Sequence, residues 1–159
     1  MKNRTIIGID PGKDGGVAMM ADGVVLECMV MPDSTNGIFR LLNGNDSLEF
    51  FGADLCVLEL VHAMPGQGVV SMFSFGKHYG EIIGVLTALS IPYQLVTPQR
   101  WKKVVLEGLN WKGDKEAAVR YVQAKYPDLE LPKNKKKRSG IADAICIAEF
   151  GRLQNKEVK

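Results

Sequence analysis

The sequence lacks the features of a membrane or secreted protein. No apolar run approaches the roughly 18 residues that a membrane-spanning helix needs, and no signal peptide precedes the first apolar segment. Cysteine is scarce: Cys28, Cys56 and Cys146 lie inside apolar runs, at spacings typical of neither a metal site nor a redox pair. We therefore expect a cytoplasmic protein whose cysteines are reduced, buried packing residues.

The chain also lacks internal repeats, linkers and a strong charge bias. Its 159 residues are enough to bury one substantial core, so we expect a single domain over residues 1–159. The 20 basic and 18 acidic residues give a net charge of only +2. The positions of the charges therefore say more about function than their sum.

Apolar runs and turn residues predict a mixed α/β fold. The first three strands should form an antiparallel meander, because Ala21-Asp22-Gly23 is typical of a hairpin turn. The run 55–58 is apolar throughout, which favours a central strand buried on both faces. Alternation with helices then indicates a sheet with helices on its faces. The expected strands are 5–9, 17–20, 24–31, 55–58 and 93–96, and the expected helices are a poorly formed one within 33–49, 70–89, a short one from Pro98, 113–126 and 139–153.

The predicted helix 70–89 carries Gly76, Gly80 and Gly84 on one face. Each glycine inside a helix is unfavourable by roughly 0.5–1 kcal/mol relative to alanine, so a close neighbour should explain the stripe. Tight packing on the sheet is the preferred explanation. A seam between the helices of two subunits is the alternative.

Three acidic residues stand where burying a charge is unfavourable. Asp10 and Glu59 each end an apolar strand, and Asp143 lies in a helix that is apolar almost all round. The helix dipole would offset only about 0.3–1 kcal/mol of the burial of Asp143. If the two strands are neighbours, the carboxylates meet at one sheet edge, where a divalent cation would neutralise them. Oxygen ligands favour Mg²⁺ or Mn²⁺, and two such ions about 3.5–4 Å apart would support hydrolysis of a phosphodiester.

Positive charge gathers next to this predicted site. Five of the six residues 133–138 are basic, and they directly precede the helix of Asp143. Such a run is often only a solvated loop, but its position favours contact with a phosphate backbone. Lys102, Lys103, Lys112 and Lys115 are further candidates, whereas Trp101 is expected in the core and His78 is expected to be structural.

Four segments occur in the order seen in RuvC-type Holliday junction resolvases: GIDPG at 8–12, LELV at 58–61, PGQGVVSMFSFGKHYG at 65–80 and ADAICIA at 142–148. The chain resembles this family, and especially its short phage-encoded members. GIDPG alone would be weak evidence, because actin-like ATPases open similarly. The resemblance implies an RNase H-like fold with a mixed five-stranded sheet, and a homodimer that makes paired nicks in four-way or other branched DNA. It also implies Mg²⁺ or Mn²⁺, two ions per site, with no organic cofactor and no membrane partner.

The resemblance assigns roles to individual residues. Asp10, Glu59 and Asp143 match three of the family's four acidic metal ligands and would be catalytic. Lys102 and Lys115 match DNA-contacting lysines, His62 matches an aromatic residue at the junction, and the glycine-striped helix matches the dimer interface. The predicted DNA-binding residues are therefore Lys102, Lys115, Lys135, Lys136, Lys137, Arg138, His62 and Gln67.

One position departs from the family pattern. The fourth acidic ligand usually stands three residues before the last aspartate, and here that position is Gly140. Its neighbour Ser139 is most simply a helix N-cap, and alternatively holds a water on a second ion. The departure leaves open a junction-binding module that has weakened or lost cleavage. An actin-like ATPase or sugar kinase is disfavoured, because one core of this size leaves no room for a second lobe.

Overall fold

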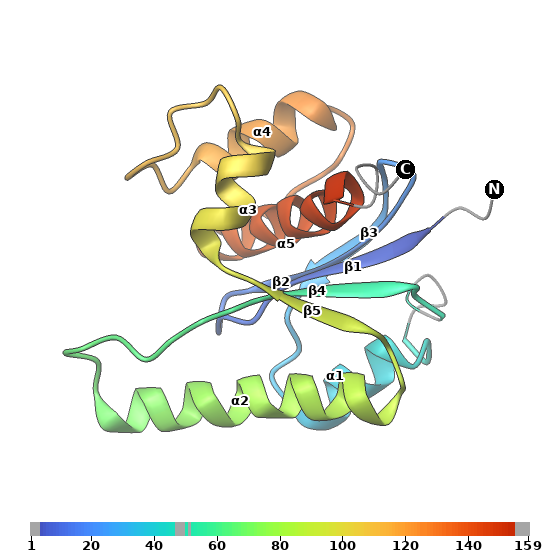
Figure 1. Cartoon of the computed structure of the whole chain (residues 1–159), viewed down its shortest axis with the longest axis vertical. Helices are drawn as coiled ribbons and strands as arrows, with labels where there is room; N and C mark the ends of the chain where they lie inside the picture. The colour runs from blue at the N-terminus through green and yellow to red at the C-terminus, as the bar shows by residue number, and fades with distance from the viewer. Residues whose placement is uncertain (1–3, 47–49, 51, 155–159) are drawn as a thin grey trace.

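The computed structural model describes residues 4–46, 50 and 52–154, and their strands form one five-stranded sheet (Figure 1). The strand order is β3-β2-β1-β4-β5. Pairing is antiparallel from β3 to β1 and parallel from β1 to β5, so the predicted mixed sheet is confirmed. The strands are β1 (Thr5–Asp10), β2 (Gly16–Ala21), β3 (Val24–Val30), β4 (Leu55–Glu59) and β5 (Tyr93–Val96).

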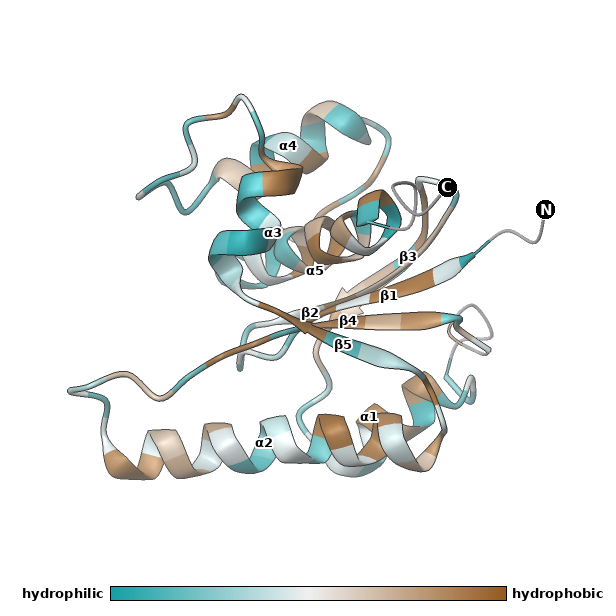
Figure 2. Ribbon diagram, viewed as in Figure 1, coloured by the Kyte–Doolittle hydropathy of each residue, from teal (hydrophilic) through white to brown (hydrophobic). Residues whose placement is uncertain are grey.

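Helices cover both faces of this sheet. One face carries α1 (Thr35–Leu42) and α2 (Val69–Ala88), and the other carries α3 (Pro98–Val105), α4 (Ala117–Lys125) and α5 (Lys135–Gln154) (Figure 1). Each face has its own apolar core, and the central strands between them are mostly brown in Figure 2. Within the described ranges, no helix has the length and apolar character to cross a bilayer.

Two predicted helix starts are wrong, and local capping explains both. The helix expected within 33–49 does lie there, as α1, and it is regular because Ser34 caps it by accepting a hydrogen bond from the Gly37 amide (3.1 Å); residues 47–49 lie outside the described part. The helix expected from residue 113 begins at Ala117, since Asp114 first accepts a bond from the Glu116 amide (2.9 Å).

The last helix begins four residues earlier than predicted, at Lys135 rather than Ser139. Asn134 accepts a hydrogen bond from the Lys137 amide (3.1 Å) and so takes the capping role predicted for Ser139. Residues 135–138 of the basic run therefore form the first turn of α5 instead of a loop, and Lys133 and Asn134 precede the helix.

The preferred explanation of the glycine stripe is also wrong. A Cβ built at Gly76, Gly80 or Gly84 meets no described atom within 4 Å, so these glycines do not pack on the sheet. The prediction for cysteine holds only in part: Cys56 and Cys146 are buried, Cys28 is half-buried, and all three are free.

Candidate active site

The register of the two central strands brings Asp10 and Glu59 together. β1 and β4 are parallel, and Ile9 pairs with Leu58, so the two acids follow at the same edge of the sheet. Side chains alternate along a strand. Ile9 and Leu58 belong to the core on the α2 side, so Asp10 and Glu59 point to the α5 side.

α5 reaches the same place because glycine lets it lie directly on β1. A Cβ at Gly8 would stand 2.1 Å from the Ala144 carbonyl oxygen and 2.4 Å from the Ala148 nitrogen. Only glycine fits this contact. It sets Asp143, the neighbour of Ala144, beside the carboxyl end of β1.

A second glycine contact occupies the position of the family's fourth acidic ligand. Gly15 and Gly140 form an isolated bridge between their backbones. A Cβ at Gly140 would lie 2.0 Å from the Asp14 carbonyl oxygen, so no side chain fits there without movement of the 11–16 turn. Glycine in place of the usual acid at position 140 therefore allows α5 to pack closely against the 11–16 turn.

The three acids influence one another electrostatically. Burial raises the pKa of Asp143 to about 8, and the negative charges of Asp10 and Glu59 contribute to that rise. Burial also raises the pKa of Glu59 to about 7, with a further contribution from Asp10. For Asp10 the direction is the same, again mainly through burial. The charge of Asp10 thus acts on Glu59 and Asp143, and that of Glu59 acts on Asp143, so the three carboxylates lie near one another at the sheet edge.

Few groups of the protein counteract this repulsion. Asp10 Oδ1 accepts a hydrogen bond from the Gly12 amide (3.0 Å), and Glu59 Oε2 accepts one from Trp101 Nε1 (2.6 Å). The positive charge of Lys102 lowers the pKa of all three acids, but burial outweighs it. The carboxylate cluster (Asp10, Glu59 and Asp143) therefore carries uncompensated negative charge when ionised.

This donor set suits a hard divalent cation. Its three residues are half-buried, and the hydrogen bonds from described residues reach only Asp10 Oδ1 and Glu59 Oε2. Within the described ranges, no three Asp, Glu, His or Cys side chains form a ready-made metal cage. The carboxylate cluster supplies the type of oxygen donor that Mg²⁺ and Mn²⁺ prefer, but its side chains would have to move closer together to hold such an ion.

A polar hollow of about 240 Å³ adjoins Asp143. Lys102 and Lys115 line it, as does Ser139, which stands one helical turn before Asp143 on α5. The predicted lysines and the predicted serine thus gather at one acid of the cluster. A larger hollow of about 660 Å³ lies beside α2 and includes Lys13, Gln67 and His78 but none of the three acids, so we assign the chemistry to the smaller one.

The other predicted DNA-binding residues are more dispersed. Lys136 and Lys137 are exposed on the first turn of α5, and Lys135 there lies 3.5 Å from Glu116. Arg138 donates to the Lys133 carbonyl (3.1 Å), which is a structural contact. His62 and Gln67 are exposed on the loop between β4 and α2 and do not line the small hollow.

Sequence reasoning missed two features. Trp101 is buried as predicted, but its hydrogen bond to Glu59 joins residues 42 apart in the chain. Glu149, a second acid in α5, is only 1% exposed and is paired with Lys125 and Arg152. The apolar run around Glu149 was the available signal, since it marked the whole helix as buried.

Comparison with known proteins identifies the fold. No family model matches the sequence, and no curated protein matches it significantly. Among solved structures, Thermus thermophilus RuvC in complex with a Holliday junction substrate superposes with a TM-score of 0.68 at 16% identity, covering 97% of this chain and 96% of that one. A second Thermus thermophilus RuvC structure gives 0.59 at 13% identity, covering 94% and 96%. A yeast mitochondrial Holliday junction resolvase gives 0.61 at 11% identity, covering 98% and 81%. The RuvC-type, RNase H-like fold expected from the resemblance is thereby confirmed.

Proposed function

We propose that this protein is a structure-selective DNA endonuclease that resolves four-way or other branched DNA junctions by metal-dependent phosphodiester hydrolysis. The convergence of Asp10, Glu59 and Asp143 on the α5 side of the sheet edge is the observation that carries the proposal. The likeness in fold to two junction-resolving enzymes supports the substrate class.

In this proposal the carboxylate cluster holds Mg²⁺ or Mn²⁺, with two ions per site as the resemblance to RuvC-type resolvases implies. A bound ion would lower the pKa of a water molecule and stabilise negative charge on the leaving oxygen. The Gly12 amide orients Asp10, and the rigid strand ends fix the separation of Asp10 from Glu59. Lys102 and Lys115, which line the hollow at Asp143, would bind the phosphate next to the cut.

The exposed lysines at the start of α5 would bind the DNA backbone farther from the cut. Replacing Lys135, Lys136 and Lys137 with alanine should reduce the slope of log affinity against log salt by up to about 0.9 per lost phosphate contact. Arg40→Ala on α1, across the sheet from α5, is the charge control. An unchanged slope in the triple variant would remove this turn from the interface.

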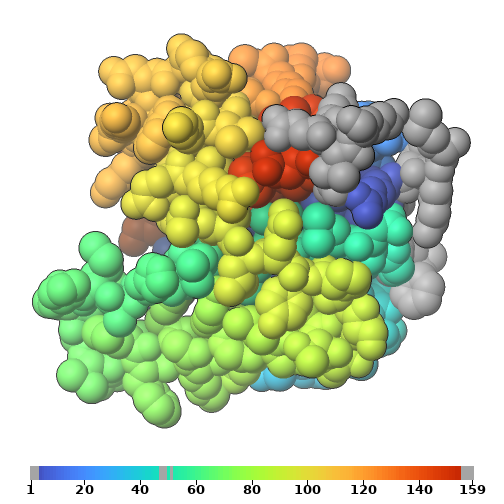
Figure 3. All heavy atoms as spheres, in the orientation of Figure 1, coloured from blue at the N-terminus to red at the C-terminus, as the bar shows by residue number. Residues whose placement is uncertain are grey.

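Assembly as a homodimer through α2 is part of the proposal. The start of α2 projects from the body with its preceding loop (Figure 3), and Val69, Val70 and Phe73 there are 82%, 80% and 74% exposed. The open glycine stripe continues this surface. Gly80→Leu should weaken dimerisation in sedimentation experiments. Gln123→Leu on α4, which lies on the other face of the sheet from α2, should not.

Incubation with a synthetic four-way junction tests the function directly. We expect paired, symmetric nicks with Mg²⁺ or Mn²⁺, and junction binding without nicks for Asp10→Asn. Binding without cleavage by the wild type would favour the second candidate, a junction-binding module. The observation in favour of this candidate is that Gly140 has no side chain to serve as the fourth acidic ligand. Nucleotide hydrolysis without DNA would instead support an ATPase. A cytoplasmic location, as predicted from the sequence, accords with a DNA substrate.

A further inference from the structure

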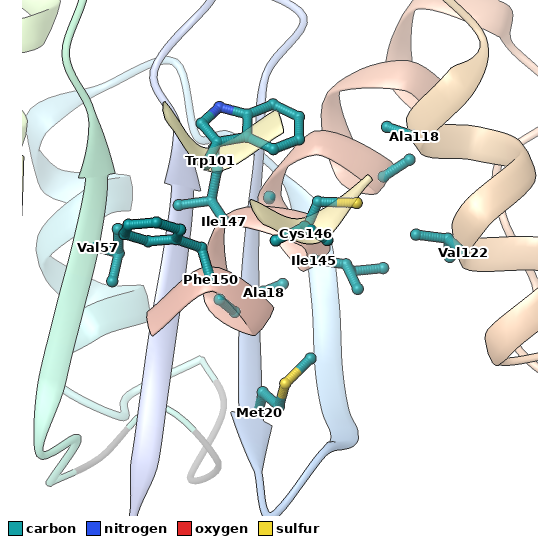
Figure 4. Packing of buried hydrophobic residues seen from close by; sticks show 14 of the residues in the cluster. Ala18, Met20, Val57, Trp101, Ala118, Val122, Ile145, Cys146, Ile147 and Phe150 are labelled. Carbon is teal, nitrogen blue, oxygen red and sulfur yellow. The ribbon is translucent and has the colours of Figure 1, made fainter. Parts of the chain in front are cut away.

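Trp101 connects the apolar core to the carboxylate cluster. Its side chain is fully buried, and Figure 4 shows it above Ile147 of α5. The indole Nε1–H donates to Glu59 Oε2 at 2.6 Å. A buried indole N–H needs an acceptor, and a backbone carbonyl would meet that need. Here the acceptor is one of the three clustered acids, so the contact bears on the site as well as on the fold.

Both partners of this hydrogen bond stand on rigid elements. Glu59 pairs with Val96 at the end of the β4–β5 ladder, and the Leu60 amide donates to the Val96 carbonyl (2.7 Å). The next residue, Thr97, caps α3 by accepting a hydrogen bond from the Arg100 amide (3.3 Å). Trp101 therefore sits one turn into a capped helix that starts beside the strand end bearing Glu59.

The same indole also positions positive charge. Lys102 Nζ lies 5.2 Å from the centroid of the Trp101 ring, within the range of a cation–π contact. Lys102 lines the hollow at Asp143. One buried side chain thus restrains a carboxylate on one side of the cluster and the neighbouring ammonium group on the other.

We propose that Trp101 is a positioning residue, which holds Glu59 by its indole hydrogen bond with Oε1 left available for a divalent cation. This inference rests on the proposed function only for the role of Glu59 as a metal ligand. Groups that orient metal ligands through hydrogen bonds commonly change metal affinity or activity by about 10–100-fold when removed.

Trp101→Phe keeps an aromatic ring and removes the donor. We expect Mn²⁺ binding, measured from the free-ion signal in electron paramagnetic resonance, to weaken by about 10-fold. The chain has two tryptophans, so Trp111→Phe is the matched control and should bind Mn²⁺ as the wild type does. Circular dichroism and thermal melts establish that each variant is folded. Equal Mn²⁺ affinity in wild type and folded Trp101→Phe would overturn the inference.

A second measurement follows the Trp101 side chain itself, so it does not depend on the stability of a variant at position 101. The two indole N–H signals are resolved by ¹⁵N–¹H correlation spectra and assigned with the two phenylalanine variants, or with Trp111→Phe alone. We expect the Trp101 signal to move in Glu59→Gln, and to move on saturation with Mg²⁺ while the Trp111 signal stays. In Asp10→Asn, Mg²⁺ should leave the Trp101 signal in place.

The outcomes separate this inference from the proposed function. A wild type that binds Mn²⁺ and cuts junctions while the Trp101 signal ignores Mg²⁺ would overturn the role of Trp101 alone. A wild type that binds no Mn²⁺ at all would overturn both, and the missing Mn²⁺ binding would identify that case.

Discussion

Asp143 and Glu149 lie six positions apart on the same buried helix, and their pKa values are shifted in opposite directions. Burial raises the pKa of Glu149, but hydrogen bonds from Arg152 and Lys125 outweigh burial and leave its pKa below the usual value. Both Arg152 bonds to Glu149 are 2.6 Å long. Burial raises the pKa of Asp143 to about 8, and its acidic neighbours Asp10 and Glu59 add to the rise.

The difference teaches what a buried acid implies. Glu149 is balanced by cations of the same chain, so it contributes to the fold and needs nothing from outside. Asp143 has two more acids nearby and is balanced only in part by Lys102, so the cation that we propose at this site would favour its ionisation. Burial of a carboxylate alone therefore does not indicate a metal site. The charge of the neighbouring side chains is the better guide, because acidic neighbours leave the carboxylate without a counter-charge.

Asp143→Asn should give the largest effect. It removes a predicted metal ligand, so we expect junction cleavage to fall by at least about 100-fold, beyond the usual effect of losing a group that only supports a ligand. The metal-free protein should be at least as stable as the wild type, because a repelled charge is gone. Single-turnover cleavage and denaturant unfolding test both halves, and retained cleavage would remove Asp143 from the site.

Glu149→Gln should have the reverse profile. It leaves the Lys125 and Arg152 charges without a counter-charge, and the expected loss of unfolding free energy is about 3 kcal/mol. Lys125 and Arg152 keep side-chain exposures of 33% and 17%, so water softens the loss and we place it at the low end of that class. Cleavage per folded molecule, measured well below the melting temperature, should be unchanged. A variant as stable as the wild type would contradict the contrast drawn between the two acids.

A matched pair of new acids tests whether the cluster can accept a fourth. Gly140→Asp meets the Asp14 carbonyl oxygen, and we expect it to destabilise the fold by about 1–3 kcal/mol and to weaken Mn²⁺ binding. Ser139→Asp, which points into the hollow that Asp143 lines, should fold normally and bind Mn²⁺ more tightly. Tighter binding by Gly140→Asp would mean that the 11–16 turn yields easily.

The sequence was sufficient for the acids of the cluster because each ends or interrupts an apolar run. Pro11 and Gly12 mark the end of β1 locally. That β1 and β4 are neighbours was only a condition of the prediction, and the parallel pairing of Ile9 with Leu58 is seen in the fold alone. The start of α5 was missed because lysines in a first turn oppose the helix dipole, and the Asn134 cap outweighs that signal. The bonds of Trp101 to Glu59 and of Lys125 to Glu149 join distant residues. No local spacing encodes such pairs, so only the fold reveals them.

The pH dependence of stability should also distinguish Asp143 from Glu149, with a smaller effect than the substitutions above. A raised pKa means that the folded, metal-free protein still holds a proton at a pH where the unfolded chain has lost it. For Glu59 this pH range runs from the ordinary pKa of 4.5 to about 7, and for Asp143 it runs from 3.8 to about 8. Unfolding free energy therefore falls as the pH rises through this window. We expect the melting temperature to drop by a few degrees between about pH 5.5 and 8.5, each kcal/mol being worth roughly 2–4 °C.

Saturating Mg²⁺ should cancel this drop, because the cation favours the ionised acids and binds more tightly as their protons leave. Asp143→Asn should flatten the metal-free profile. Glu149 has a lowered pKa and contributes stability that is lost only as the pH falls below its ordinary range, so Glu149→Gln should lower the curve above about pH 5 without changing its slope. Differential scanning calorimetry with and without Mg²⁺ provides the comparison. A metal-free profile that rises with pH in the wild type would show that the carboxylates of Asp10, Glu59 and Asp143 are already balanced by the protein itself, as Glu149 is.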